Sequence, residues 1–465
     1  MTTYYCGLGG NDGNTGLSWA QRKATLNGCE DVPITAGSTV YVAPGVYREM
    51  LTADVAGTAG NPITYIGDVT GEHTDGVGGI VRITGSDDDL SATRANCIVQ
   101  NTPRTYRTWR GFYFDTTTGY EFTATSGLTY NIIEDCIFMP CGSHCIGLQG
   151  SATLNNNTIR RCIIIPHRSY IGLYINYSAA QIDNSANLIE NCLFIGGTSQ
   201  VNIGRVGGTT VKNCTFQSQS AITGSGAVFS NTTLTGGQTI TVNNCIFQNC
   251  GTALGAQNTA DITENYNTLY GNNTDRTNTN TGANSVTTPA LLAPPLQLSG
   301  LTFPWQIGVL SNWSQVKAIA GSGTATDDIF GMARPATAAK ISWGAFQYND
   351  VSRSATQAHA GTYALKMADA GRTQFQIPTT NVSTVFSVWV YFEADYTGTK
   401  PQMVIKQPGV ADTTVVATGA VTTWEELTTT LTPAASPGYV IMELVSNNTA
   451  AATNFATYFD DITVT

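Results

Sequence analysis

A short motif recurs along the middle of the chain and limits the folds that the chain can adopt. Each copy has a hydrophobic residue, two polar residues, a cysteine and, two positions later, a large hydrophobic residue. The five copies are IIEDCIF (132–138), TIRRCII (158–164), LIENCLF (188–194), TVKNCTF (210–216) and TVNNCIF (241–247). The cysteines lie 26, 30, 22 and 31 residues apart, at Cys136, Cys162, Cys192, Cys214 and Cys245. Irregular but bounded spacing indicates one coil of chain per copy, with outer loops of variable length.

Two weaker copies extend the series to seven coils, because Phe112 lies 24 residues before Cys136 and Tyr266 lies 21 residues after Cys245. In every copy the position two before the cysteine is polar or charged, so the strand must bend there rather than alternate. The residue just before the cysteine forms the corner, and Asn and Asp tolerate the left-handed conformation that a sharp corner needs. The predicted corner residues are Asp135, Arg161, Asn191, Asn213, Asn244 and Asn265.

Charges two residues before the cysteine alternate in sign from coil to coil. They are Arg110, Glu134, Arg160, Glu190 and Lys212, followed by Asn243 and Glu264. Opposite charges become neighbours if the coils stack as parallel strands about 4.8 Å apart. The sequence therefore predicts a parallel β-helix whose interior holds ladders of like residues. These ladders are the five cysteines, the series Phe138, Ile164, Phe194, Phe216 and Phe247, and the polar series Asn131, Asn157 and Asn187.

The chain resembles the right-handed parallel β-helix proteins of the pectate-lyase-like superfamily, especially phage tailspikes and fibres. The opening YYCGLGGNDGNTGLSWAQRKATLNG (4–28) is similar to their capping strand, turn and short helix. GSTVYVAPGVYRE (37–49) and GTAGNPITYIGD (57–68) resemble the first two rungs, while DDIFGMARP (327–335) and WGAFQY (343–348) resemble a closing rung. The resemblance implies an all-β chain with an N-terminal cap over residues 1–36 and a right-handed parallel β-helix over 37–348.

The remaining residues, 349–465, resemble a carbohydrate-binding module with an antiparallel β-sandwich of jelly-roll type. Strands are expected in SATQAHAGTYALKM (354–367), VFSVWVYFEA (385–394), TWEELTTTLT (423–432) and YFDDITVT (458–465). Trp389, Tyr391 and Trp424 could offer rings to a sugar, but their place in alternating strands favours a core role.

Charge and cysteine content exclude several classes of function. With 22 Lys and Arg residues and a net charge of −10, the chain is not expected to bind nucleic acid. No long apolar run predicts membrane insertion, and the first residues lack a secretory-signal pattern. The eleven cysteines are an odd number, lie mostly in strand-like runs and include no C-x-x-C pair. They are expected to be reduced core thiols made in a reducing cytoplasm, without a metal site.

The richest polar stretches follow the cysteine corner in three successive coils: PCGSHCIGL (140–148), PHRSYIGLYIN (166–176) and GGTSQVNIGR (196–205). Aligning Ser143, Ser169 and Ser199 predicts that His144, Tyr170 and Gln200 lie side by side. Such rings and hydrogen-bond donors suit a glycan groove, and a solvated face is the competing interpretation. The candidate catalytic residues are His144, His167 and Arg168, and the candidate glycan-binding residues are Tyr170, Tyr174 and Arg205.

No complete catalytic set is evident. The Asn-Thr-Asp, Asp-Asp, Gly-His-Gly and Arg-Ile-Lys motifs of polygalacturonases are missing, as is a pectate-lyase-like Asp cluster with a nearby Arg. Asp87, Asp88 and Asp89 could hold Ca²⁺, but a solvated loop is the favoured interpretation, so no cofactor is expected.

The resemblance implies a tailspike- or fibre-like virion surface protein that is made in the host cytoplasm and binds a host or environmental polysaccharide, with depolymerisation as a further possibility. Other virion proteins would be partners, and the family implies a homotrimer. Two alternatives stay open. One is an extracellular polysaccharide lyase or glycoside hydrolase with a carbohydrate-binding module, and the other is a purely structural or decoration protein of a virion.

Overall fold

The computed structural model describes residues 2–31, 34–100, 104–150, 153–178, 180–217, 226–287, 325–329, 351–354, 357–360, 364–368, 370–378, 382–394, 396–407, 410–432, 439–447 and 456–464. The chain divides into two compact units, one from Met1–Val69 and Gly79–Gln347 and the other from Thr70–Gly78 and Tyr348–Thr465. Each unit is described by itself. The expected boundaries after residues 36 and 348 stay predictions.

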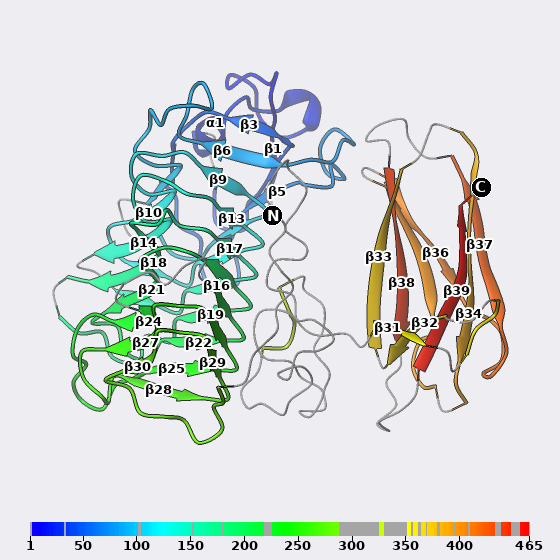
Figure 1. Ribbon diagram of the computed structural model, residues 1–465. Coiled ribbons are helices and arrows are strands. Elements are labelled where there is room, and N and C mark those ends of the chain that lie inside the picture. Colours follow the sequence, from blue (N-terminus) through cyan, green and yellow to red (C-terminus); the bar gives the residue numbers. More distant parts are fainter. Residues whose placement is uncertain are drawn as a thin grey trace. The chain divides into compact units, whose positions relative to one another are not determined.

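The first unit is a stack of coils whose strands form three parallel sheets (Figure 1). Sheet A contains β1 (Thr3–Cys6), β2 (Thr39–Val42), β5 (Ile63–Gly67), β8 (Arg107–Arg110), β12 (Ile132–Glu134), β16 (Thr158–Arg160), β19 (Leu188–Glu190), β22 (Thr210–Lys212), β25 (Ile240–Asn243) and β28 (Ile262–Asn265). Sheet B contains β3 (Gly45–Tyr47), β6 (Val81–Thr84), β9 (Tyr113–Asp115), β13 (Ile137–Phe138), β17 (Ile163–Ile164), β20 (Leu193–Ile195), β23 (Thr215–Gln217), β26 (Ile246–Gln248) and β29 (Thr268–Tyr270).

Sheet C contains β4 (Leu51–Thr52), β7 (Ile98–Gln100), β10 (Phe122–Ala124), β14 (Ile146–Gly150), β18 (Ile171–Tyr177), β21 (Ser199–Gly204), β24 (Gly226–Ser230), β27 (Thr252–Ala256) and β30 (Thr274–Thr277). A small extra sheet pairs β11 (Leu128–Thr129) with β15 (Leu154–Asn155). Each coil runs from sheet A to sheet B to sheet C, so the predicted parallel β-helix is confirmed. The predicted opening strand and short helix are β1 and α1 (Leu26–Glu30), with a 3₁₀ turn, η1 (Trp19–Gln21), between them.

The corner between sheets A and B has the predicted conformation. Asp135, Arg161, Asn191, Asn213 and Asn244 all have a positive φ, between 50° and 57°. The cysteine that follows points inward with no exposed surface, and its thiol donates to the carbonyl two residues earlier, as from Cys136 to Glu134 at 3.1 Å. Cys162, Cys192, Cys214 and Cys245 repeat this bond at 3.2–3.4 Å. Cysteine fits the corner because it is small, apolar and a weak donor to a carbonyl left inside the turn.

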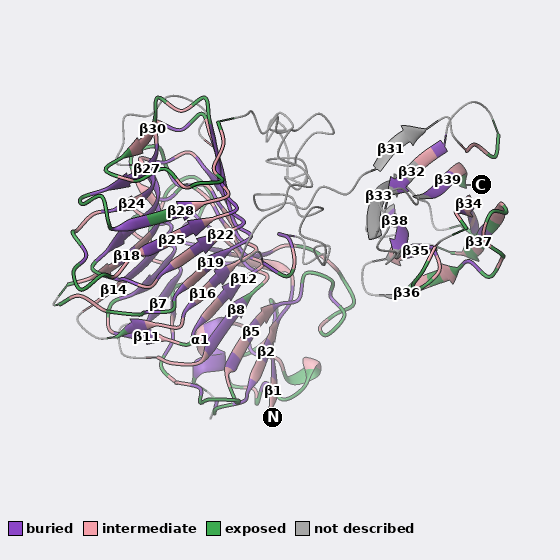
Figure 2. Ribbon diagram, turned by 90° about the horizontal axis from the view of Figure 1, so that it is seen from below, coloured by how far each residue is buried: buried purple, intermediate pink, exposed green. Residues whose placement is uncertain are grey.

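The interior is filled by the predicted ladders, and Figure 2 shows that burial is concentrated along the sheets. Phe216 stacks on Phe194 and on Phe247 with ring centroids 5.0 and 4.7 Å apart. In the polar ladder, Oδ1 of Asn157 accepts from the Asn131 backbone N–H at 3.1 Å, and Asn157 donates its own backbone N–H to Asn187 at 3.0 Å. Each side-chain amide therefore satisfies the backbone of an adjacent coil, which a polar group in a core requires.

The charge ladder is in the predicted register, because Glu134 pairs with both Arg110 and Arg160, and Glu190 with Lys212. Arg160 contacts Glu134 at 2.6 Å. The acidic members of the ladder, Glu134 and Glu190, are buried.

The last coil is shifted by one residue from the predicted alignment. Glu264 pairs with Val242 instead of Asn243, and the positive φ falls on Tyr266 instead of Asn265. Glu264 therefore points into the core, where Arg276 contacts it at 2.7 Å.

A buried ion pair closes the interior near the first coils. Arg107, at the start of β8, has no exposed surface and makes two hydrogen bonds to Glu30, the last residue of α1. It also donates to the carbonyl of Val55 at 2.7 Å, and its guanidinium lies 4.9 Å from the ring centroid of Trp109. The hydroxyl of Tyr65 donates to Glu30 at 2.7 Å.

Residues 325–329, which we call the strap, return along the corner between sheets A and B. The Ala325 N–H donates to Asn213 at 2.8 Å, and Asp327 accepts from Asn191 at 2.8 Å and Arg161 at 3.0 Å. The expectation that Asp327 begins a closing rung is therefore wrong, because the strap runs across coils that are already complete. Residues 330–348 of that expectation lie outside the described part of the chain.

The second unit has two antiparallel sheets. One contains β31 (Val351–Ser354), β32 (Ala364–Ala368), β39 (Ala456–Val464), β34 (Thr384–Phe392) and β37 (Glu425–Leu431), and the other contains β33 (Ala370–Pro378), β38 (Tyr439–Asn447), β35 (Gln402–Gln407) and β36 (Val410–Val416). Side chains from both sheets, such as Phe386, Val388 and Met442, share one core. The predicted β-sandwich is confirmed, and its jelly-roll connectivity stays a prediction. Within the described residues, no helix is long and apolar enough to cross a bilayer.

Candidate functional site

Four rings gather outside sheet C. Tyr120 and His144 precede β10 and β14 by the same two residues, so they occupy equivalent places in neighbouring coils. The ring centroid of His144 lies 5.4 Å from Tyr120, 6.1 Å from Tyr170 and 5.2 Å from Tyr174, all at steep interplanar angles. All four side chains are half-buried. We call Tyr120, His144, Tyr170 and Tyr174 the ring cluster.

Gly147 on β14 leaves room for the Tyr120 ring of the ring cluster. A Cβ atom added at Gly147 would come within 2.6 Å of the Tyr120 ring, so any side chain there would displace that ring. The Tyr120 hydroxyl accepts a hydrogen bond from Gln149 on β14 at 2.7 Å. The cluster is therefore held by both neighbouring coils.

His144 is fixed as a neutral ring. Its Nδ1 accepts a hydrogen bond from the Ile171 backbone N–H at 3.1 Å, which leaves the proton on Nε2. Burial lowers the pKa of His144, which also favours the neutral form. His144 thus offers a hydrogen-bond donor between tyrosine rings.

A polar track continues from the ring cluster across sheet C. Asn202 is in register with Tyr174 and accepts a hydrogen bond from Asn231 at 2.7 Å. Phe229 occupies the next position in the same row. The rings of the cluster and the amides of Asn202 and Asn231 offer apolar faces and hydrogen-bonding groups, which suit a polyhydroxylated chain.

The other candidates from the sequence are placed at different distances from the cluster. His167 is exposed, with its ring 5.6 Å from Tyr170, and Arg168 beside it is exposed. Arg205 follows the far end of β21 and donates to the Ser178 carbonyl at 3.0 Å. Since Arg205 is three residues beyond Asn202, the partner of Tyr174, it lies about 10 Å along the strand from that rung.

The alignment by serines is wrong. Ser199 pairs with Ile171, and Gln200 therefore lies level with Gly172 instead of Tyr170. The connection from sheet B to sheet C differs in length from coil to coil, so residues of the same type within this connection are not in register.

A second group of rings lies on the five-stranded sheet of the sandwich. Phe386, Val388, Val390 and Phe392 fill the core, which places Trp389 and Tyr391 on the opposite, partly exposed face. The favoured core interpretation of these two rings is thus wrong, because the alternation has the opposite phase. Trp424 lies beside Tyr391, with centroids 5.5 Å apart.

His359 completes this surface, and no sequence motif singles it out. Its ring stacks on Trp389 at 3.8 Å and 11°, and it lies edge-on to Trp424 at 5.5 Å. Nδ1 of His359 lies 2.7 Å from an oxygen of Asp461, and its backbone N–H donates to Asp460 at 2.8 Å. We call His359, Trp389, Tyr391 and Trp424 the sandwich platform.

Two acidic clusters differ in their partners. Asp87 and Asp89 form ion pairs with Arg94 and Arg48 at 2.6 Å each, and Asp88 accepts from the backbone of Leu90 and Ser91. Asp87 and Asp88 are thus engaged within their loop, and Asp89 is engaged by arginines outside it, Arg48 and Arg82.

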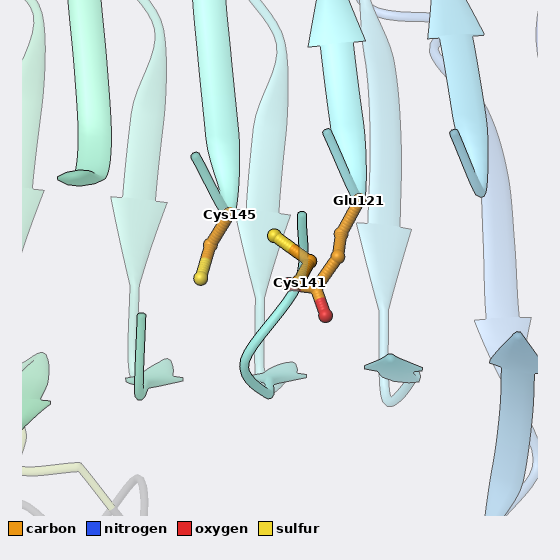
Figure 3. A group of neighbouring side chains, drawn as sticks. All are labelled: Glu121, Cys141 and Cys145. Carbon is orange, nitrogen blue, oxygen red and sulfur yellow. The ribbon is translucent and has the colours of Figure 1, made fainter. Parts of the chain in front are cut away.

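The other cluster is buried and was not predicted. Figure 3 shows Glu121, Cys141 and Cys145, whose carboxylate and sulfur atoms lie within 4.8 Å of one another. Oε1 of Glu121 accepts from the Met139 N–H at 3.2 Å, and its Oε2 has no hydrogen-bond partner among the described residues. Cys141 and Cys145 lie four residues apart in one turn, but no sequence motif links them to Glu121, which comes from the preceding coil.

The three parallel sheets class the chain with parallel β-helix proteins that carry an antiparallel β-sandwich. No family model matches it, and no curated protein does. Pectate lyase Pel9A is 13% identical and matches 75% of this chain and 96% of its own, with a TM-score of 0.40. A tailspike protein from Acinetobacter baumannii bacteriophage Fri1, described as a capsular polysaccharide depolymerase, is 11% identical over 92% of this chain and 81% of its own, with a TM-score of 0.35.

A Family 16 carbohydrate binding module is 18% identical and matches 25% of this chain and 86% of its own, with a TM-score of 0.21. At these identities and TM-scores the likenesses carry no functional argument, so function has to be inferred from the chain's own residues.

Proposed function

We propose that this protein binds a glycan chain and that the sandwich platform is its principal contact. The observation that carries this proposal is the group of partly exposed rings at His359, Trp389, Tyr391 and Trp424 on one face of the five-stranded sheet. Indole and phenol rings supply rigid apolar area with a polar edge, which suits the faces of pyranose rings. Asp460 and Asp461 hold His359 against this surface.

The test is binding of the full chain to a panel of soluble neutral and acidic polysaccharides, measured by affinity electrophoresis and calorimetry. Trp389→Ala and Trp424→Ala should each weaken binding about 30-fold, which corresponds to a loss of about 2 kcal/mol for an aromatic anchor. Trp19→Ala is the matched control, because Trp19 is also a partly exposed tryptophan but lies in the other unit. Equal binding by all three variants would contradict the proposal.

The ring cluster on sheet C is proposed as a second glycan contact, with depolymerisation as a further activity. Its rings and the amides of Asn202 and Asn231 follow successive coils, about 4.8 Å apart, so they can contact an extended chain that crosses the coils. His144→Gln and the His167→Ala/Arg168→Ala pair should reduce binding or turnover and leave the melting temperature within a few degrees. Release of reducing ends or of unsaturated products from any panel member would establish the enzyme.

We further propose a place on a virion surface, as a homotrimer attached to other virion proteins. The eleven cysteines are all buried free thiols, which supports assembly in a reducing cytoplasm. Virion proteomics together with the mass of the native assembly tests this placement. An exported, monomeric protein with lyase or hydrolase activity would favour the extracellular alternative, and lack of both binding and turnover would favour a structural or decoration role.

A further inference from the structure

An unusual column of inward-facing residues lies where three coils enter sheet C. Ile98, Phe122 and Ile146 are paired across β7, β10 and β14, and the residues just before them are Cys97, Glu121 and Cys145. All three have no exposed surface. A carboxyl group therefore stands between two thiols in the interior of the β-helix.

Cys141 reaches the same place from the turn that follows β13. Its sulfur, that of Cys145 and a carboxylate oxygen of Glu121 lie within 4.8 Å of one another (Figure 3). Cys97 is turned away from this group, because its thiol donates to the carbonyls of Ile83 at 3.3 Å and Asp115 at 3.7 Å.

The carboxyl group of Glu121 is poorly satisfied by the protein. Oε2 has no hydrogen-bond partner among the described residues, and no ion pair is described for Glu121. A fully buried polar atom without a partner is costly, and a bound ion is one arrangement that satisfies such an atom.

We propose that Glu121, Cys141 and Cys145 bind a Zn²⁺ ion. Thiolate ligands favour a soft or borderline metal, and Cys sulfur and Glu carboxylate oxygen are both zinc ligands. Ligand atoms around tetrahedral zinc lie about 3.6–3.8 Å apart, so the three residues need to move by about 1 Å. The fourth position belongs to a water molecule, since Cys141 is 7% exposed and gives the site a path to solvent.

The ion would link two successive coils. It would tie β10 to the turn before β14, and His144 of the ring cluster lies between the two cysteines in that turn. Because binding displaces protons from both thiols, the affinity should rise with pH.

The experiment uses the reduced full chain, stripped with a chelator, equilibrated with zinc chloride and separated from free metal. Mass spectrometry should find one zinc per chain, and Co²⁺ should give a sulfur-to-metal charge-transfer band. Cys141→Ser and Glu121→Gln should each weaken zinc binding by at least about tenfold, since even second-sphere changes reach that size. Cys250→Ser is the matched control, because Cys250 is a buried thiol three residues after Phe247, as Cys141 is after Phe138.

Metal content and absorption need no glycan, so the outcome is independent of the proposed function. The site is overturned if the wild type retains no more zinc than Cys141→Ser. It is also overturned if Cys250→Ser loses as much metal, or if freshly purified protein contains a Cys141–Cys145 disulfide. The melting temperature of metal-free Glu121→Gln should equal that of the metal-free wild type, which shows that any loss of zinc binding does not come from misfolding.

Discussion

Replacing Arg107 with methionine should destabilise the first coils of the β-helix. Methionine keeps most of the side-chain volume but removes both hydrogen bonds to Glu30 and the bond to the Val55 carbonyl. The carboxylate of Glu30 is then left buried, with the Tyr65 hydroxyl and the Asp54 N–H as its remaining partners. Removing one partner of a buried ion pair costs about 3–5 kcal/mol.

The pH dependence of the contribution that Glu30 makes to stability should also change sign in the Arg107→Met variant. Burial alone would raise the pKa of Glu30, but Arg107 and Tyr65 outweigh it and lower the pKa. Because the pKa of Glu30 is lowered in the folded state, the ionised carboxylate stabilises the protein above the pKa of unfolded Glu, about 4.3. This stabilisation is lost as pH falls through the pKa of Glu30 in the folded state. Without Arg107 the pKa of Glu30 should be raised, so the variant should lose stability relative to wild type as pH rises from 4 to 7.

Hydrogen exchange read on β1, β2 and β5 is the suitable assay, because a stack of coils can open locally. Arg160→Met is the control, since Arg160 is 33% exposed in its ion pair and should cost less than about 1 kcal/mol. In the double variant Glu30→Leu/Arg107→Met no charge is left unpaired, so it should recover much of the loss. The reasoning fails if Arg107→Met exchanges like wild type, or if the double variant is as unstable as the two single losses combined.

Three further outcomes are expected. Protonation of His144 would place an N–H of its ring against the Ile171 N–H, and burial lowers the pKa of His144. The stability that neutral His144 contributes is therefore present above about pH 6.5, and it is lost as pH falls through the pKa of the folded state. A tyrosine signal from the ring cluster that does not change on acidification would contradict this expectation. Asn157→Ala leaves the Asn131 N–H and the Leu128 carbonyl of the preceding coil without their partner, and it should lower the free energy of unfolding by about 2–5 kcal/mol in urea titrations. A loss under about 1 kcal/mol would show that water replaces the amide. Gly147→Ala should displace the Tyr120 ring and weaken glycan binding with little change in melting temperature, and unchanged affinity would remove Tyr120 from the site.

The core of the β-helix could be predicted because every coil has to make the same bend and to fill the same interior positions. The left-handed corner, the inward cysteine and the alternating charges recur at fixed offsets, so one alignment sets the register of all of them. The alignment failed at Tyr266, where the last coil lacks the cysteine that fixed the others. The ion pair of Arg107 with Glu30 could not be predicted either, because 77 residues separate the partners and Glu30 lies outside the repeat.

The candidate sites were predictable in part. His144, Tyr170 and Tyr174 do lie together, since residues in successive coils that leave for sheet C must emerge on the same side. Arg205 lies apart because a strand of sheet C is long enough to separate its two ends. The phase of β34 was misjudged, because Val385–Phe392 alternates two sets of large hydrophobic side chains and the pattern alone does not say which set faces the partner sheet.

The strap changes how the coil stack should respond to force. Coils that contact only their neighbours can peel away one at a time from an end. Ala325 and Asp327 instead tether Asn213, Asn191 and Arg161 across sequence separations of 112, 136 and 166 residues. Under tension these three coils should therefore remain wound until the tether detaches and then extend in a single large step.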